Sequence, residues 1–203
     1  MFGLKKTHKL GLILSYITVG YNVIEGIVSV IVGSLTGSVA LVGFGLDSFI
    51  ESLSGSVMIW RLGKHGKMTE EEEEAVEAKA ATLVGITFFI LAAYIAYEVL
   101  MKFLSREAPE ASLVGIVIAI LSLLVMPTLT YMKYKTGKAI NSPSLVADSK
   151  QTLVCVLMSV TLLISVTINY FLPLWWLDPA AGLVFVIILV REGYMAIKYK
   201  DLC

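Results

Sequence analysis

Six apolar segments, each long enough to cross a bilayer as a helix, constrain the fold of this chain most. About 20 apolar residues are needed to span about 30 Å of hydrocarbon. Of the 203 residues, 57% are hydrophobic and 16% charged, too little charge for an ordinary soluble domain. We therefore expect one domain, 1–203, an all-α six-transmembrane-helix bundle. Its spans lie at about 10–32, 37–60, 81–103, 112–132, 144–171 and 176–198.

Lysine and arginine are distributed unevenly between the short connections. Because cytoplasmic loops carry an excess of these residues, the distribution predicts that both termini are cytoplasmic. We expect a multi-pass protein of the plasma (inner) membrane, and the zero net charge argues against a nucleic-acid partner. The side opposite the cytoplasm holds Lys102 and Arg106, and the cytoplasmic side holds Lys5, Lys6, Lys9, Arg61, Lys64, Lys67, Lys133, Lys135, Lys138, Lys198 and Lys200.

Two acids, Asp47 and Glu51, lie four residues apart inside the second apolar segment. On a helix this spacing places both side chains on one face, one turn apart. An acid at the centre of a membrane costs about 2.5–3.5 kcal/mol on the insertion scale. Carboxylate oxygens bind protons and divalent metal ions well. The pair therefore predicts a cation site.

The fifth segment carries Gln151 and Cys155, also four residues apart. Counting about 1.5 Å per residue from the outer end of the second segment places Asp47 about 15 Å deep and Glu51 about 21 Å deep. Counting from the inner end of the fifth segment places Gln151 about 10 Å and Cys155 about 16 Å above the inner surface. In a core of about 30 Å the two pairs are level, so two antiparallel helices would present four ligands. Cys155 is equally well explained as a small buried apolar side chain.

Three further polar residues have calculated depths near these pairs. Asn22 and Glu25 of the first segment lie about 18 and 22 Å above the inner end, so Glu25 would complete the site or carry a proton. Asp148 lies closer to the cytoplasm, where it would guide a cation inward. Alternatively, Asp148 pairs with Lys150 or caps the helix that follows Ser142.

Other charged residues have local interpretations. The Thr69 to Glu72 spacing predicts a capping box at a helix start, and the glutamates at 70–74 form either a solvated helix start or a cation antenna. Asp178, before a proline, is expected to cap its own helix. Glu192, near the cytoplasmic end of the last segment, is expected to extend toward the interface.

Three motifs resemble those of the cation diffusion facilitator family: residues 33–51, the stretch 141–148 and the stretch 178–184. Residues 47–61 and 176–178 are most similar to the branch of the transmembrane protein 163 type. The resemblance covers all six segments in order. It implies export of a divalent metal, usually against protons and usually by a homodimer. It also implies a metal site made by one ligand pair on the second span, here Asp47 and Glu51, and another pair on the fifth.

The chain departs from the family pattern in two respects. The fifth-span pair is usually His and Asp, and here the positions hold Gln151 and Cys155, so Glu25 is a candidate for the missing negative charge. The family's cytoplasmic metal-binding domain is expected to be missing, because the sequence ends at Cys203.

The sequence thus predicts a divalent-metal efflux transporter working by alternating access. The predicted ligands are Asp47 and Glu51, completed by Cys155, Gln151 and Glu25. Zinc is the first choice of metal because it accepts mixed oxygen and sulfur ligands, with manganese, iron(II) and cobalt as alternatives. A non-transporting metal sensor or partner-binding subunit is the rival, and an organic-cation exporter a third option. An enzyme is not expected, since no histidine lies within a span.

Overall fold

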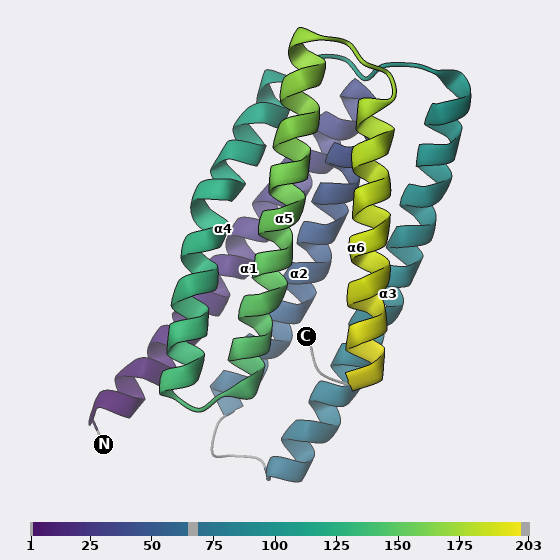
Figure 1. Cartoon of the computed structure of the whole chain (residues 1–203). Coiled ribbons are helices and arrows are strands. Elements are labelled where there is room, and N and C mark those ends of the chain that lie inside the picture. Colours follow the sequence, from purple (N-terminus) through teal and green to yellow (C-terminus); the bar gives the residue numbers. More distant parts are fainter. Residues whose placement is uncertain (1, 65–68, 200–203) are drawn as a thin grey trace.

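The computed structural model describes residues 2–64 and 69–199, which form a bundle of six helices (Figure 1). Each predicted span coincides with one helix. Lys67, Lys200 and Cys203, used above, lie outside the described residues. The helices are α1 (Phe2–Thr36), α2 (Val39–Lys64), α3 (Glu70–Ser105), α4 (Leu113–Ala139), α5 (Pro143–Phe171) and α6 (Leu177–Tyr199).

Helices α1 and α3 extend well beyond their apolar segments. The start of α3 is the predicted capping box: the Thr69 hydroxyl accepts from the Glu72 amide, and the Glu72 carboxylate accepts from the Thr69 amide. Both residues are exposed. The capping-box prediction is therefore confirmed.

The helices pack most closely in three pairs, α1 with α2, α4 with α5, and α3 with α6. Glycine permits two of these approaches, because small residues let helix backbones touch in membranes. A Cβ on Gly26 of α1 would lie 2.9 Å from the backbone oxygen of Gly45 of α2, and the reverse contact is also 2.9 Å. A Cβ on Gly85 of α3 would lie 3.0 Å from the backbone oxygen of Gly193 of α6, and the reverse contact is also 3.0 Å. Helix α2 also touches α3, α5 and α6, which places it at the centre of the bundle.

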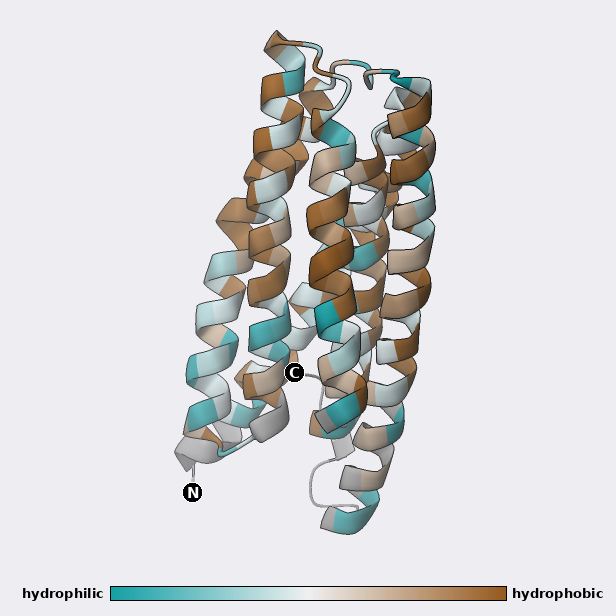
Figure 2. Ribbon diagram, turned by 45° about the vertical axis from the view of Figure 1, so that its right-hand side comes forward, coloured by the Kyte–Doolittle hydropathy of each residue, from teal (hydrophilic) through white to brown (hydrophobic). Residues whose placement is uncertain are grey.

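Large apolar side chains are exposed along the outer faces of the helices, as expected in contact with lipid. Figure 2 shows hydrophobic residues along most of the length of the helices and hydrophilic ones gathered toward the end near the N-terminus. In the described part of the chain, five helices are long and apolar enough to cross a membrane on their own, and α2 is not one of them. Helix α2 is nevertheless 26 residues long, and most of its residues are shielded by neighbouring helices.

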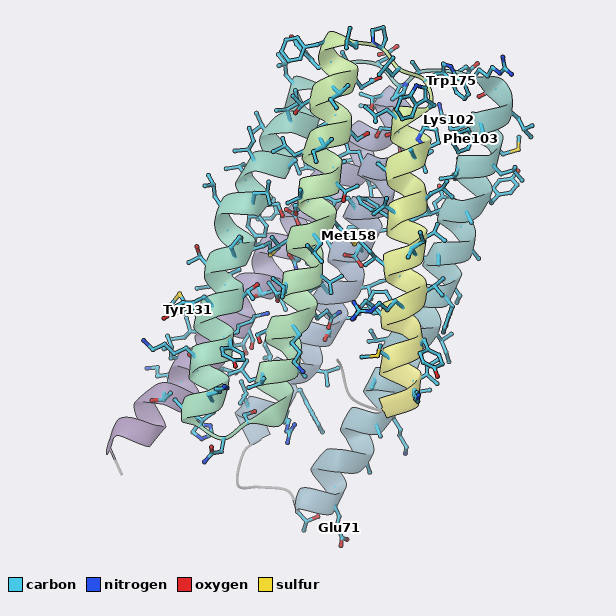
Figure 3. All side chains as sticks on the ribbon, in the orientation of Figure 1. Glu71, Lys102, Phe103, Tyr131, Met158 and Trp175 are labelled. Atoms are coloured by element: carbon cyan, nitrogen blue, oxygen red, sulfur yellow. The ribbon has the colours of Figure 1, made fainter. Side chains whose placement is uncertain are left out.

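The helices alternate in direction, so α1 begins and α6 ends at the same end of the bundle (Figure 1). This end carries Lys135, Lys138 and Lys198. At the opposite end, Trp175 packs edge-on against Phe103, with ring centroids 6.0 Å apart, and the Arg106 guanidinium lies 5.6 Å from its ring (Figure 3). This arrangement is typical of an aromatic residue at a membrane interface.

Asp178 caps a helix other than the expected one. Its carboxylate accepts from the Ser38 hydroxyl, from the Val39 amide at 2.7 Å and from the Ala40 amide at 3.4 Å. Asp178 lies in the first turn of α6, and these three donors lie at the start of α2. The expectation that Asp178 caps its own helix was wrong, because the packing of α6 against α2 brings the unpaired amides of α2 to its carboxylate.

Candidate metal site

The two acids of α2 lie in the interior of the bundle. Asp47 is 6% exposed and Glu51 2% exposed, and neither Glu51 oxygen has a hydrogen-bond partner among the described residues. A carboxylate without a partner in a low-dielectric interior requires a positive charge or a proton. Asp47 and Glu51 lie close enough for their charges to repel each other. Helix α2 thus places two acids side by side in the interior of the bundle.

Helix α1 adds a third acid. The Ser48 hydroxyl of α2 donates to one oxygen of Glu25 at 3.0 Å, and the other Glu25 oxygen has no hydrogen-bond partner in the described residues. Asn22, one turn earlier, is fully buried, and its amide oxygen and nitrogen are likewise unpartnered there. These two residues therefore bring unused oxygen atoms to the side of α1 that packs against α2.

Helix α5 contributes Gln151 and Cys155, which are 5% and 1% exposed. Glu25, Asp47 and Glu51 all lie close enough to Cys155 to interact electrostatically with its thiol. Neither polar atom of the Gln151 amide has a hydrogen-bond partner among the residues described. Figure 3 shows Met158 about halfway along α5, and Cys155 lies three residues before it. The structure thus places Cys155 at the middle of the bundle with the three acids.

The side chains of Glu25, Asp47, Glu51 and Cys155 lie near one another, but they are not arranged as a complete set of metal ligands. In the part of the chain that the structure describes, no three His, Cys, Asp or Glu side chains are close enough together to hold a metal ion as they stand. Metal binding here requires the side chains, or the helices that carry them, to move closer.

Asp148 has a partner that the sequence did not suggest. The Lys133 ammonium of α4 lies 2.8 Å from one Asp148 oxygen and donates to the Thr152 hydroxyl at 3.0 Å, and the side chains of the ion pair are 0% exposed. Neither Asp148 oxygen makes a directed hydrogen bond in the described residues, so the contact is an ion pair. Lys150 is exposed, and the expected pairing with it was wrong.

The lysine distribution placed Lys133 on the cytoplasmic side of the membrane. It lies six residues before the end of α4, which is about 9 Å along the helix axis. The predicted span ends at residue 132, so the sequence carried no signal that Lys133 would be buried.

Helix α6 places a further acid near the site. Glu192 is 5% exposed, and its charge acts on Asp47. Its neighbour Arg191 is exposed and donates to a Glu192 oxygen at 3.4 Å. The expectation that Glu192 extends to the interface was wrong. The face of α6 that carries Glu192 packs inward, and Arg191, on the next face, is the residue that reaches the surface.

Comparison with known proteins identifies the family to which the chain belongs. The model of the cation efflux transmembrane domain matches residues 15–200. The chain belongs to the cation efflux family. This confirms the resemblance drawn from the three motifs, the integral membrane location and the expectation that the protein is a transporter-family member and not an enzyme.

Individual curated proteins are similar to this chain along most of its length. Transmembrane protein 163 of Xenopus laevis is 24% identical over 91% of the chain and 65% of its own length. An uncharacterized transporter of Synechocystis is 29% identical over 74% of the chain and 50% of its own length. A cadmium, cobalt and zinc/H(+)-K(+) antiporter of Bacillus subtilis is 25% identical over 92% of the chain and 60% of its own length. The chain spans about half to two thirds of the length of these relatives.

Proposed function

We propose that this cation efflux protein moves a divalent metal ion out of the cytoplasm, with Asp47 and Glu51 as the principal ligands. The observation that carries the proposal is the pair of buried acids on the central helix, one of them with both oxygens unpartnered in the described residues. Such acids are retained inside a membrane when a cation binds to them. Glu25 and Cys155, which lie within electrostatic reach of the pair, are the proposed additional ligands, and Gln151 and Asn22 supply neutral oxygens.

Zinc is the proposed metal. Two carboxylates and a thiolate form a mixed oxygen and sulfur set that zinc binds in tetrahedral geometry. Manganese and iron(II) prefer harder ligands and would make less use of Cys155. The similar Bacillus subtilis protein is named as an antiporter of cadmium, cobalt and zinc, which supports zinc over manganese and iron(II).

Transport is proposed to proceed by alternating access, with protons competing for the same carboxylates. A site that binds a metal when deprotonated releases it when protonated, so a pH difference across the membrane can drive release. We also propose that the protein works as a homodimer, as the family resemblance implies.

The test is metal flux into proteoliposomes under a pH gradient, with zinc, manganese, iron(II) and cobalt offered separately. Asp47→Asn and Glu51→Gln remove the charge of each ligand and are expected to abolish the flux of the transported metal. Glu107→Gln is the matched control, since Glu107 is an exposed acid in the connection after α3. Its flux should equal that of the wild type.

The competing function is a metal sensor or partner-binding subunit, which binds metal without moving it. Calorimetry on the same samples separates the two functions. Zinc binding that depends on Asp47 and Glu51, with no flux of any of the four metals, would replace the transport proposal with the sensor.

A further inference from the structure

The ion pair between Lys133 and Asp148 lies beside the proposed metal site on its cytoplasmic side. Asp148 is on α5 three residues before Gln151, about 4.5 Å along the helix axis, and on adjoining turns of the helix the two share a face. Lys133 reaches Asp148 from α4 and also binds Thr152, one turn further along α5. The ammonium group therefore lies between the Asp148 carboxylate and the Thr152 hydroxyl.

The charge balance of the interior makes this lysine unusual. Among the side chains that the structure describes, Lys133 is the only buried cation, whereas six acids are buried: Glu25, Asp47, Glu51, Asp148, Asp178 and Glu192. Asp178 is engaged with the start of α2. The Lys133 charge acts on Glu51 as well as on Asp148, and the Asp148 charge also acts on Glu51. Lys133 is thus coupled to a proposed metal ligand.

We infer that Lys133 is a tethered cation that keeps Asp148 out of the coordination shell of the metal and thereby sets the affinity of the site. The inference rests on the proposed function. While Asp148 is paired with Lys133, it is not available as a ligand, and the positive charge repels an incoming divalent ion. Without the lysine, the Asp148 carboxylate would be free to join Glu51 and Gln151. A site with too many carboxylates would hold its metal too tightly to release it.

A purely structural ion pair predicts a different result. If Lys133 only links α4 to α5, its removal lowers stability and leaves metal binding unchanged or weaker. If Lys133 is a tethered cation, its removal makes binding tighter. The sign of the change in affinity therefore distinguishes the two roles.

The experiment measures the dissociation constant of zinc by calorimetry on the full chain in detergent micelles. Lys133→Met should bind zinc about tenfold more tightly or better, given the strength of charge interactions at low dielectric. It should also transport zinc more slowly in proteoliposomes, because release is impaired. Lys133→Arg keeps the charge and should bind as the wild type does. Lys135→Met is the matched control: this lysine is two residues further along α4 and exposed, and its removal should have no effect.

A second variant tests the role of Asp148. Lys133→Met combined with Asp148→Asn removes both charges, leaves the net charge of the interior unchanged and strands no carboxylate. Its dissociation constant should return to within about threefold of the wild type. If Lys133→Met alone does not fold without metal, because a stranded buried carboxylate is strongly destabilising, its thermal unfolding is followed against zinc concentration. Zinc should then stabilise it at lower concentrations than those that shift the wild type.

Two outcomes would overturn the inference in distinguishable ways. Unchanged or weaker zinc binding in Lys133→Met, with binding still lost in Asp47→Asn and Glu51→Gln, overturns the role of Lys133 and leaves the proposed function standing. Absence of zinc binding in the wild type, together with absence of binding of the other three metals, overturns both.

Discussion

Replacing Asp178 by alanine should destabilise the protein by removing the cap of a helix distant in sequence. The carboxylate serves two buried backbone amides, those of Val39 and Ala40, and the Ser38 hydroxyl. Each buried donor left without an acceptor costs about 1–3 kcal/mol. The Ala40 contact is long, the hydroxyl can rotate, and removal of a buried charge offsets part of the loss. We expect a loss of about 2–4 kcal/mol in the free energy of unfolding.

Two further variants define how this loss arises. Asp178→Asn keeps one oxygen acceptor for the short bond to the Val39 amide and should lose about half as much. Ser112→Ala removes an ordinary N-cap, in which the Ser112 hydroxyl accepts from the Gly115 amide in the first turn of α4 at 3.0 Å. This change should lower the free energy of unfolding by about 1 kcal/mol.

The assay is equilibrium unfolding in micelles, combined with hydrogen exchange of individual amides. The amides of Val39 and Ala40 should lose protection in Asp178→Ala while those in the middle of α2 keep it. A loss of stability below about 0.5 kcal/mol, or no change in exchange at these two amides, would refute the reasoning that α6 caps α2.

Three further predictions follow from packing, ligand type and proton competition. Gly26→Ala should destabilise the α1–α2 pair by about 1–3 kcal/mol, because its Cβ would meet the Gly45 backbone. Gly20→Ala, on the same helix with open space around it, should be neutral or stabilising in the same unfolding assay. Cys155→Ser should weaken zinc binding more than manganese binding in calorimetry, because it replaces a soft ligand by a hard one, and equal losses would argue against ligation by sulfur. Zinc affinity should fall as pH falls, since protons displace the metal from carboxylates, and an affinity that rises on acidification would contradict a carboxylate site.

The number and order of the helices could be predicted from sequence, because hydrocarbon thickness fixes a minimum length of apolar residues. The ends of α1 and α3 could not be predicted from the same pattern. Both helices continue past their apolar segments, so the apolar pattern does not mark where they begin. Only the capping box at Thr69 indicated where α3 begins.

The part of the candidate site that depends on how deep each residue lies along its helix could be predicted from the sequence. Rise per residue was enough to place Cys155 near the level of Asp47. The partners of Asp148 and Glu192 were not predictable in this way. They depend on how α4 and α6 are rotated about their axes, and rotation is set by packing that the sequence of one helix does not specify. The distribution of lysines gives orientation, and it cannot separate an interfacial lysine such as Lys135 from a buried one such as Lys133.

The polar character of α2 has a consequence for how the protein is made. On its own, this helix is a poor substrate for membrane insertion, since its two acids and many serines favour water. Helix α1 is apolar enough to insert, and a tight turn with a left-handed Gly37 (φ +69°) joins it directly to α2. The glycine contacts between them allow the two helices to enter the bilayer as one hairpin. The insertion machinery would therefore meet α2 already covered on one side, and the later helices would complete its shielding as they emerge from the ribosome.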